Sequence, residues 1–157
     1  MRQVLSRNTF RITYDTKFRE VISECSKAPR RNQHGTWITH DMIEAYCALH
    51  KEGLAHSVEV WKDESLVGGL YGVSLGKIFC GESMFARESN ASKAGFITLV
   101  GDLIRKDFLL IDSQVHTDHL ESLGAEEIPR PEYLRILGEA LTHETIRGNW
   151  GEVFGRK

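Results

Sequence analysis

The sequence predicts an α+β fold in which a mixed, mostly antiparallel sheet is flanked by helices. Helical apolar stripes surround a central stretch, 56–82, where the apolar period changes to two, as is typical of strands. A further helix and a short apolar segment follow, so the expected order is two helices, three strands, helix, strand and helix. With 157 residues and 41% hydrophobic composition, the chain is expected to form one domain, 1–157.

The first two helices are predicted from residues spaced three and four apart. Their stripes are Phe18, Val21, Ile22 and Cys25, then Met42, Ile43, Tyr46 and His50. We expect Asp15 to cap the first helix, Thr39 to open the second and Gly53 to end it.

Three strands are expected next. Val58 and Val60 alternate with polar residues, the turn 62–65 follows, and 66–73 and 77–82 supply two more strands. Glycines in these strands allow bulges or close approach of a ligand to the backbone; they are Gly68, Gly69, Gly72 and Gly76.

The remaining elements alternate between helix and strand. Apolar spacing predicts a helix over 91–105, with Asn90 or Ser92 as its cap, and a short buried strand over 109–111. A brief helix over 117–123 and a last helix from Pro131 complete the order. The end of the chain, including Asn149, yields no motif.

Composition limits the function classes. No apolar run approaches the roughly 18 residues of a membrane span, so a cytoplasmic protein is expected. Cys25, Cys47 and Cys80 form no CxxC pair, and His116 with His119 supplies too few ligands, so no metal is expected. A net charge of −2 argues mildly against an RNA substrate, unless basic residues cluster locally.

Five short segments carry a family resemblance. They are Gly-Thr-Trp-Ile-Thr at 35–39, His-Ser-Val-Glu-Val-Trp at 56–61, Phe-Cys-Gly-Glu-Ser-Met-Phe at 79–85, Asn-Ala-Ser-Lys at 90–93 and Ile-Asp-Ser-Gln at 111–114. From about Arg11 to about Tyr133, the chain resembles the leucyl/phenylalanyl-tRNA–protein transferases. The resemblance implies the N-acetyltransferase-like fold of the GNAT superfamily, which this family shares.

The resemblance also implies an activity. Members transfer leucine, phenylalanine or, less well, methionine from aminoacyl-tRNA to acceptor proteins with N-terminal Arg or Lys, which marks these for N-degron degradation. They carry a tryptophan-rich N-terminal domain before the segment that matches Arg11, where this chain has few residues. We expect no cofactor, because 87–93 lacks the glycines with which acetyl-CoA enzymes of this fold hold pyrophosphate.

Three residues are candidate catalytic groups. The reaction needs a neutral amine, a fixed approach to the ester carbonyl and stabilisation of the oxyanion. Asp112 and Gln114, two apart on a predicted strand, are expected to share one face, and they match the family's proposed catalytic pair. Glu82 matches the acidic residue that interacts with the substrate's amino group. The alternative for Asp112 is a turn or capping role.

The resemblance also assigns binding residues. The positions of the apolar pocket are matched by Leu70, Phe79, Leu99 and Ile111. Aromatic residues near the aminoacyl-adenosine are matched by Trp37 and Tyr46, and Gly81, in the segment 79–85, is also expected to bind substrate. The alternative is that the apolar residues are simply core. Basic residues Arg30, Arg31 and Lys93 are candidates for RNA phosphates, against the alternative of a solvated charged face.

Two other functions remain open. The chain is alternatively a non-catalytic tRNA- or peptide-binding module that keeps the fold. A thiol hydrolase with Cys80 as nucleophile, served by His116 or His119 and Asp112, is the third hypothesis. It is disfavoured because Cys80 lies in an apolar strand without an activating neighbour in sequence. Capping of Cys80 with iodoacetamide is expected to abolish only the thiol enzyme.

Overall fold

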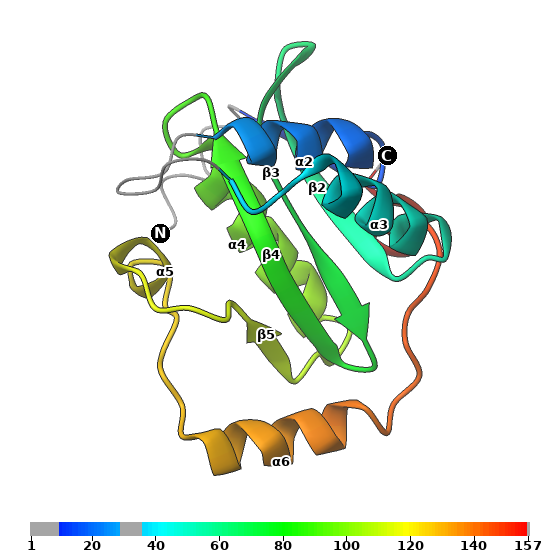
Figure 1. The fold of residues 1–157 in the computed structure, drawn as a ribbon, viewed down its shortest axis with the longest axis vertical. Helices are drawn as coiled ribbons and strands as arrows, with labels where there is room; N and C mark the ends of the chain where they lie inside the picture. Colours follow the sequence, from blue (N-terminus) through cyan, green and yellow to red (C-terminus); the bar gives the residue numbers. More distant parts are fainter. Residues whose placement is uncertain (1–9, 29–35, 157) are drawn as a thin grey trace.

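The computed structural model describes residues 10–28 and 36–156, which form a five-stranded sheet between helices (Figure 1). The strands are β1 (Arg11–Tyr14), β2 (Ala55–Lys62), β3 (Ser65–Leu75), β4 (Ile78–Ala86) and β5 (Leu110–Asp112). The helices are α2 (Phe18–Lys27), α3 (His40–Lys51), α4 (Ala91–Ile104), α5 (Asp118–Glu121), α6 (Arg130–Ala140) and α7 (Trp150–Phe154). The predicted α+β class is therefore confirmed. Within these residues, no helix has both the length and the apolar character of a membrane span.

The strands lie in the order β1-β2-β3-β4-β5, and only the last pair is parallel. In that pair, Ile78 to Cys80 of β4 face Leu110 to Asp112 of β5. The strand β4 continues to Ala86, whereas β5 ends at Asp112. Beyond Asp112, therefore, β4 has no neighbouring strand on this side, and the candidate site lies there.

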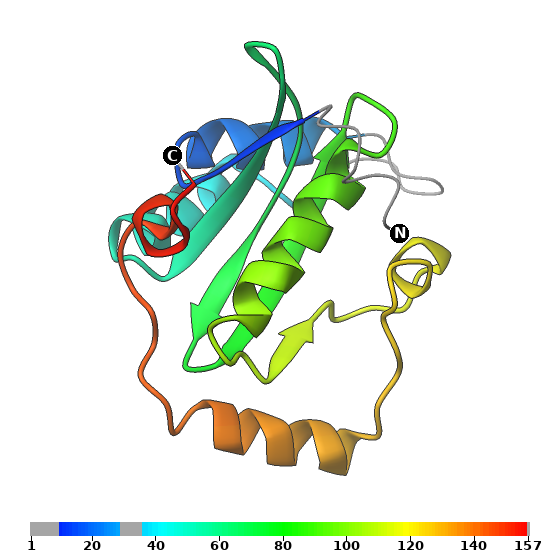
Figure 2. The ribbon, with the colours of Figure 1, turned by 180° about the vertical axis from the view of Figure 1, so that it is seen from behind.

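Each face of the sheet has its own core. Helices α2 and α3 cover one face, where Tyr71 and Phe85 pack with the predicted stripe of α2. Helix α4 crosses the other face, as seen from behind (Figure 2), where Leu70 and Phe79 pack with Leu99. Because side chains alternate along a strand, neighbouring Leu70 and Tyr71 point to opposite faces.

The predicted helix ends are partly correct. The Thr39 hydroxyl accepts a hydrogen bond from the Met42 amide over 3.3 Å, and Gly53 ends the helix in the left-handed region, at φ 71°. Asn90 also precedes its helix as predicted, but it adopts φ 66° and its side chain makes no capping hydrogen bond.

The predicted capping role of Asp15 is wrong. Its buried carboxylate instead accepts the amides of Ser57 and Trp150 and is hydrogen-bonded to Nδ1 of His56, at 2.8–2.9 Å. The residue that directly precedes α2 is Lys17. Asp15 therefore joins the start of the chain to β2 and α7 rather than stabilising α2.

Two elements, β1 and α7, were not predicted, and they lie against each other. Figure 2 shows α7 beside β1, near the end of the chain. The Trp150 ring is fully buried and stacks on His56 with centroids 3.9 Å apart. Farther on, Arg156 donates to the buried carboxylate of Asp102 from Nε over 2.8 Å. Trp150 thus belongs to the core, and Arg156 ties the residues after α7 to it.

Candidate active site

Two adjoining cavities lie where β4 and β5 diverge. The smaller, of about 230 Å³, is lined by Leu70, Tyr71, Phe79, Gly81, Glu82, Ser83, Met84, Phe96, Ile111, Ser113, Val115, Thr117, His119 and Leu120. The larger, of about 640 Å³, is lined by Leu110, Ile111, Asp112, Ser113, Gln114, Val115, His116, Thr117, Leu120, Glu121, Ala125, Glu126, Glu127, Ile128, Arg130 and Tyr133. The segment that follows β5 contributes to both cavities and forms their common wall.

Asp112 and Gln114 both line the larger cavity, but not as neighbours on one strand face. Strand β5 ends at Asp112, and Gln114 adopts a left-handed conformation, φ 66°, that is uncommon for a residue with a side chain. The Asp112 carboxylate accepts the Gln114 amide over 2.8 Å. The prediction of a shared strand face is therefore wrong, because the chain turns after Asp112. This turn, not strand alternation, brings the two residues together. The catalytic role assigned to the two residues stays a prediction.

Two further contacts hold this turn beside β4. Nε2 of Gln114 lies 3.5 Å from the carbonyl oxygen of Gly81, a long hydrogen bond. The phenol of Tyr133, on α6, donates to Oδ2 of Asp112 over 2.9 Å. Tyr133 lies in the helix that was predicted from Pro131, and no local sequence pattern relates it to Asp112.

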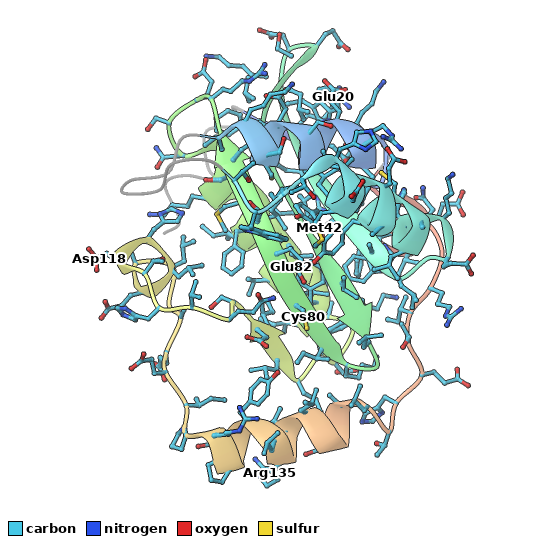
Figure 3. All side chains as sticks on the ribbon, in the orientation of Figure 1. Glu20, Met42, Cys80, Glu82, Asp118 and Arg135 are labelled. Carbon is cyan, nitrogen blue, oxygen red and sulfur yellow. The ribbon has the colours of Figure 1, made fainter. Side chains whose placement is uncertain are left out.

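Glu82 lies on the other side of the common wall, in the smaller cavity. It occupies a bulge in β4, because Tyr71 pairs with Ser83 and Gly72 pairs with Gly81, which leaves Glu82 without a partner in β3. Bulges change the direction of a side chain. Figure 3 shows Glu82 and Cys80 near the middle of the sheet, beneath the end of α3 where Met42 lies.

Tyr46 approaches Glu82 from α3. Burial, together with the hydrogen bond to Glu82, raises the pKa of the Tyr46 phenol, so this phenol remains a hydrogen-bond donor at neutral pH. The Tyr46 ring makes edge contacts with Trp37 at 6.5 Å and with Tyr71 at 5.2 Å between centroids. Because 42% of Trp37 is exposed, its ring offers an aromatic surface near the smaller cavity.

Most of the expected pocket residues line the smaller cavity: Leu70, Phe79, Gly81 and Ile111. Gly72 has no room for a side chain, because a Cβ there would lie 2.5 Å from the Phe79 ring. Leu99 does not line either cavity and is fully buried in the core behind them. The cavity adds Met84 and Phe96, which the sequence analysis did not assign.

The predicted RNA-binding residues are only partly placed. Arg30 and Arg31 lie outside the described residues. Lys93 is half-buried in the first turn of α4 and lines neither of the two cavities. Among residues 10–28 and 36–156, no group of three or more His, Cys, Asp or Glu side chains is arranged to hold a metal ion.

The environment of Cys80 does not activate a thiol. Burial and the nearby carboxylates of Asp112 and Glu82 raise the pKa of the Cys80 thiol to about 11. A reactive cysteine needs the opposite environment, with a positive charge or an imidazole that stabilises the thiolate. His116 lies instead 3.4 Å from the carboxylate of Glu121. This geometry disfavours the thiol hydrolase.

Solved structures of acetyltransferases share the fold. An aminoglycoside acetyltransferase from an uncultured soil metagenomic sample, in complex with trehalose, matches 78% of this chain and 93% of its own with a TM-score of 0.58 and 15% identity. An acetyltransferase of the GNAT family from Staphylococcus aureus Mu50 matches 78% of this chain and 87% of its own with a TM-score of 0.52 and 14% identity. The predicted GNAT-like fold is confirmed.

Curated relatives are much closer in sequence. Leucyl/phenylalanyl-tRNA–protein transferases are 56% identical over 137 residues in Flavobacterium johnsoniae and 51% identical over 152 residues in Myxococcus xanthus. The matches cover 87% and 97% of this chain, and in both cases 65% of the relative, so the chain spans slightly under two thirds of the relatives' length. The model of the family described as leucyl/phenylalanyl-tRNA protein transferase matches residues 1–138, and the chain belongs to this family.

Proposed function

We propose that the protein transfers leucine or phenylalanine, and less readily methionine, from aminoacyl-tRNA to the N-terminal amine of an acceptor protein. Family membership supports this reaction. The observation that carries the proposal is the pair of cavities with a common wall, which places Glu82 on one side and Asp112 with Gln114 on the other. Direct transfer needs such an arrangement, because the donor and the acceptor must be bound at the same time.

The smaller cavity is the proposed donor site. Its apolar walls, which include Leu70, Phe79 and Ile111, suit an uncharged side chain, because an unpaired charge buried there would cost several kcal/mol. The carboxylate of Glu82, which lines this cavity, is the proposed partner of the donor's amino group. The exposed ring of Trp37, beside Tyr46, is the proposed stacking surface for the terminal adenine.

The larger cavity is the proposed acceptor site. Besides Asp112, the carboxylates of Glu121, Glu126 and Glu127 line it, and they complement the N-terminal Arg or Lys of the proposed acceptor. The same acceptors would make the reaction a step in N-degron degradation. Because aminoacyl-tRNA and such acceptors occur in the cytoplasm, we propose that location for the protein.

The proposed reaction takes place beside Asp112, where the donor and acceptor cavities adjoin. The acceptor's amine nitrogen attacks the ester carbonyl, the bond from the carbonyl carbon to the ribose oxygen breaks, and an amide forms. The amine gives a proton to the Asp112 carboxylate, beside Gln114, and the ribose oxygen gains a proton as it leaves. Because an aminoacyl ester is already activated, positioning and proton transfer by Asp112 and Gln114 are the contributions required of the protein.

A transfer assay tests this function. The protein is mixed with leucyl-tRNA labelled on the amino acid and with a peptide that begins with Arg, and label on the peptide is measured. Parallel reactions contain phenylalanyl-tRNA or aspartyl-tRNA at equal concentration, and a peptide that begins with Asp. We expect label only from leucyl- and phenylalanyl-tRNA and only on the Arg peptide. Tight binding of leucyl-tRNA without transfer would instead support a binding module, and equal use of all donors would refute the assigned donor site.

A further inference from the structure

Both oxygens of the Asp112 carboxylate accept a hydrogen bond from the protein. Oδ1 accepts the backbone amide of Gln114 over 2.8 Å, and Oδ2 accepts the phenol of Tyr133 over 2.9 Å. The first donor is local, since Gln114 is two residues away. The second comes from a different element, α6, and fixes the rotation of the carboxylate that the local bond alone leaves open.

Helix α6 is itself anchored at its other end. The carbonyl of Ala140 accepts the Lys77 amide over 3.0 Å, and the Thr145 hydroxyl accepts the Gly76 amide over 2.8 Å. At Gly76, in the turn between β3 and β4, a Cβ would lie only 2.1 Å from the Ala140 carbonyl oxygen. The helix therefore spans the distance from this turn to Asp112, as Figures 1 and 2 show, and is held at both ends.

We propose that Tyr133 is a positioning residue, which holds the Asp112 carboxylate in the orientation that receives the acceptor's amine. The proposal rests on the proposed function of Asp112. The hydrogen bond to Asp112 raises the pKa of the Tyr133 phenol, so at neutral pH the phenol remains protonated and keeps donating. Without this donor, Oδ2 turns toward water in the larger cavity, and the approach of the amine is no longer fixed.

The test is the substitution Tyr133→Phe, which keeps the ring and removes only the hydroxyl. Arg135→Ala is the matched control, because Arg135 lies on the same helix and is exposed, pointing away from the sheet (Figure 3). In the leucine-transfer assay with an Arg-starting peptide, we expect Tyr133→Phe to lower kcat at least ~10-fold, since small misplacements of catalytic groups have effects of this size or larger. The KM for leucyl-tRNA should remain within about twofold of the parent value, because Tyr133 does not line the donor cavity.

A double-mutant cycle distinguishes positioning from a general structural role. If Tyr133 acts through Asp112, Tyr133→Phe has little further effect on kcat once Asp112 is replaced by Asn. An independent readout is the ionisation of Tyr133, measured by ultraviolet titration as the difference between the parent and Tyr133→Phe. Asp112→Asn should lower this pKa, since the hydrogen bond to the carboxylate is the main cause of its elevation.

Each outcome decides one of the two proposals. A parent protein that transfers no leucine refutes the proposed function, and the positioning role with it. A parent that transfers, combined with an unchanged kcat in Tyr133→Phe, refutes the positioning role alone. The role is also wrong if Tyr133→Phe lowers kcat equally with and without Asp112, or if Asp112→Asn leaves the Tyr133 titration unchanged.

Discussion

Cys80 and Asp112 are directly paired in the parallel register between β4 and β5. The thiol and the carboxylate therefore belong to adjacent strands at the point where these diverge, and the negative charge of Asp112 contributes to the raised pKa of Cys80, about 11. Cys80 is thus kept protonated mainly by its burial, and in addition by the charges of Asp112 and Glu82. The carboxylate is the group that remains available for chemistry.

We predict that Cys80→Ala retains transfer activity within about twofold of the parent. At pH 7, a thiol with a pKa near 11 is ionised in only ~1 molecule in 10⁴, so it contributes no nucleophile. Alkylation of Cys80 by iodoacetamide, followed by mass spectrometry, should accelerate about tenfold per pH unit as the pH rises toward 11. A ~10²-fold loss of transfer in Cys80→Ala would contradict this prediction and support Cys80 as a nucleophile.

We predict that Met84→Ala changes donor preference, whereas Leu99→Ala does not. Met84 lines the smaller cavity, so its truncation enlarges the space for a side chain, and a methylene there is worth ~1–3 kcal/mol. The ratio of phenylalanine to leucine transfer, as kcat/KM, should rise about tenfold. Leu99 is the matched control, because its truncation destabilises the same core by roughly 2–5 kcal/mol without reaching the cavity. Equal shifts in both variants would contradict the boundaries of the donor site.

We predict that Glu82→Gln acts mainly on donor binding. Loss of the charge removes a charge-assisted hydrogen bond to the donor's amino group, worth about 1.5–3 kcal/mol, so the KM for leucyl-tRNA should rise roughly 10- to 100-fold. Tyr46→Phe should raise it less, because the carboxylate remains. Glu88→Gln, at a partly exposed ion pair with Lys62, is the control and should leave KM unchanged. A fall in kcat with unchanged KM would move Glu82 from the donor site to the reaction.

We predict that the end of the chain contributes to stability through Asp102. Arg156→Ala removes a 36% exposed cation that is hydrogen-bonded to this fully buried carboxylate. Because Tyr14 and Arg105 remain as partners of Asp102, we expect a cost of about 1.5–3 kcal/mol. Arg105→Ala is the comparison, since Arg105 also pairs with Asp102 but its side chain is 63% exposed, so its loss should cost less than ~1 kcal/mol. Urea unfolding measures both values. Equal destabilisation by the two substitutions would show that Arg156 stabilises Asp102 no more than the exposed Arg105 does.

The sequence predicted the elements whose apolar residues follow a regular period. The stripe of α2 and the cap at Thr39 were correct because each depends on residues within a few positions. The strand β1 was missed because it has only four residues and is stabilised by pairing with the distant β2. Asp15 was misassigned for the same reason, since its partners include Trp150, 135 residues away.

The helix α7 carried a local signal that was not recognised. Asn149 is followed three residues later by Glu152, and the Asn149 side chain accepts the Glu152 amide over 3.2 Å. Gly155, in the left-handed region at φ 67°, ends the helix. An Asn and a Glu at this spacing, closed by glycine, predict a short helix even without a long apolar stripe.

The candidate site also has features that were predictable from the sequence and features that were not. Residues in the family motifs, such as Glu82 and Asp112, were named from the sequence, and the structure places them on opposite sides of one wall. The left-handed conformation of Gln114 and the bond from Tyr133 to Asp112 were not predictable. Both depend on how the segment after β5 meets β4 and α6, which no local pattern encodes.

Single-turnover transfer is the decisive test of whether Asp112 serves the reaction between the two cavities. The parent, Asp112→Asn and Asp118→Asn are each saturated with labelled leucyl-tRNA and mixed with an Arg-starting peptide. Asp118 is the control because it is exposed on α5 and points away from the sheet (Figure 3). We predict that Asp112→Asn slows transfer ~10²-fold or more with unchanged leucyl-tRNA affinity, while Asp118→Asn matches the parent. Transfer by folded Asp112→Asn at the parent rate would contradict the claim.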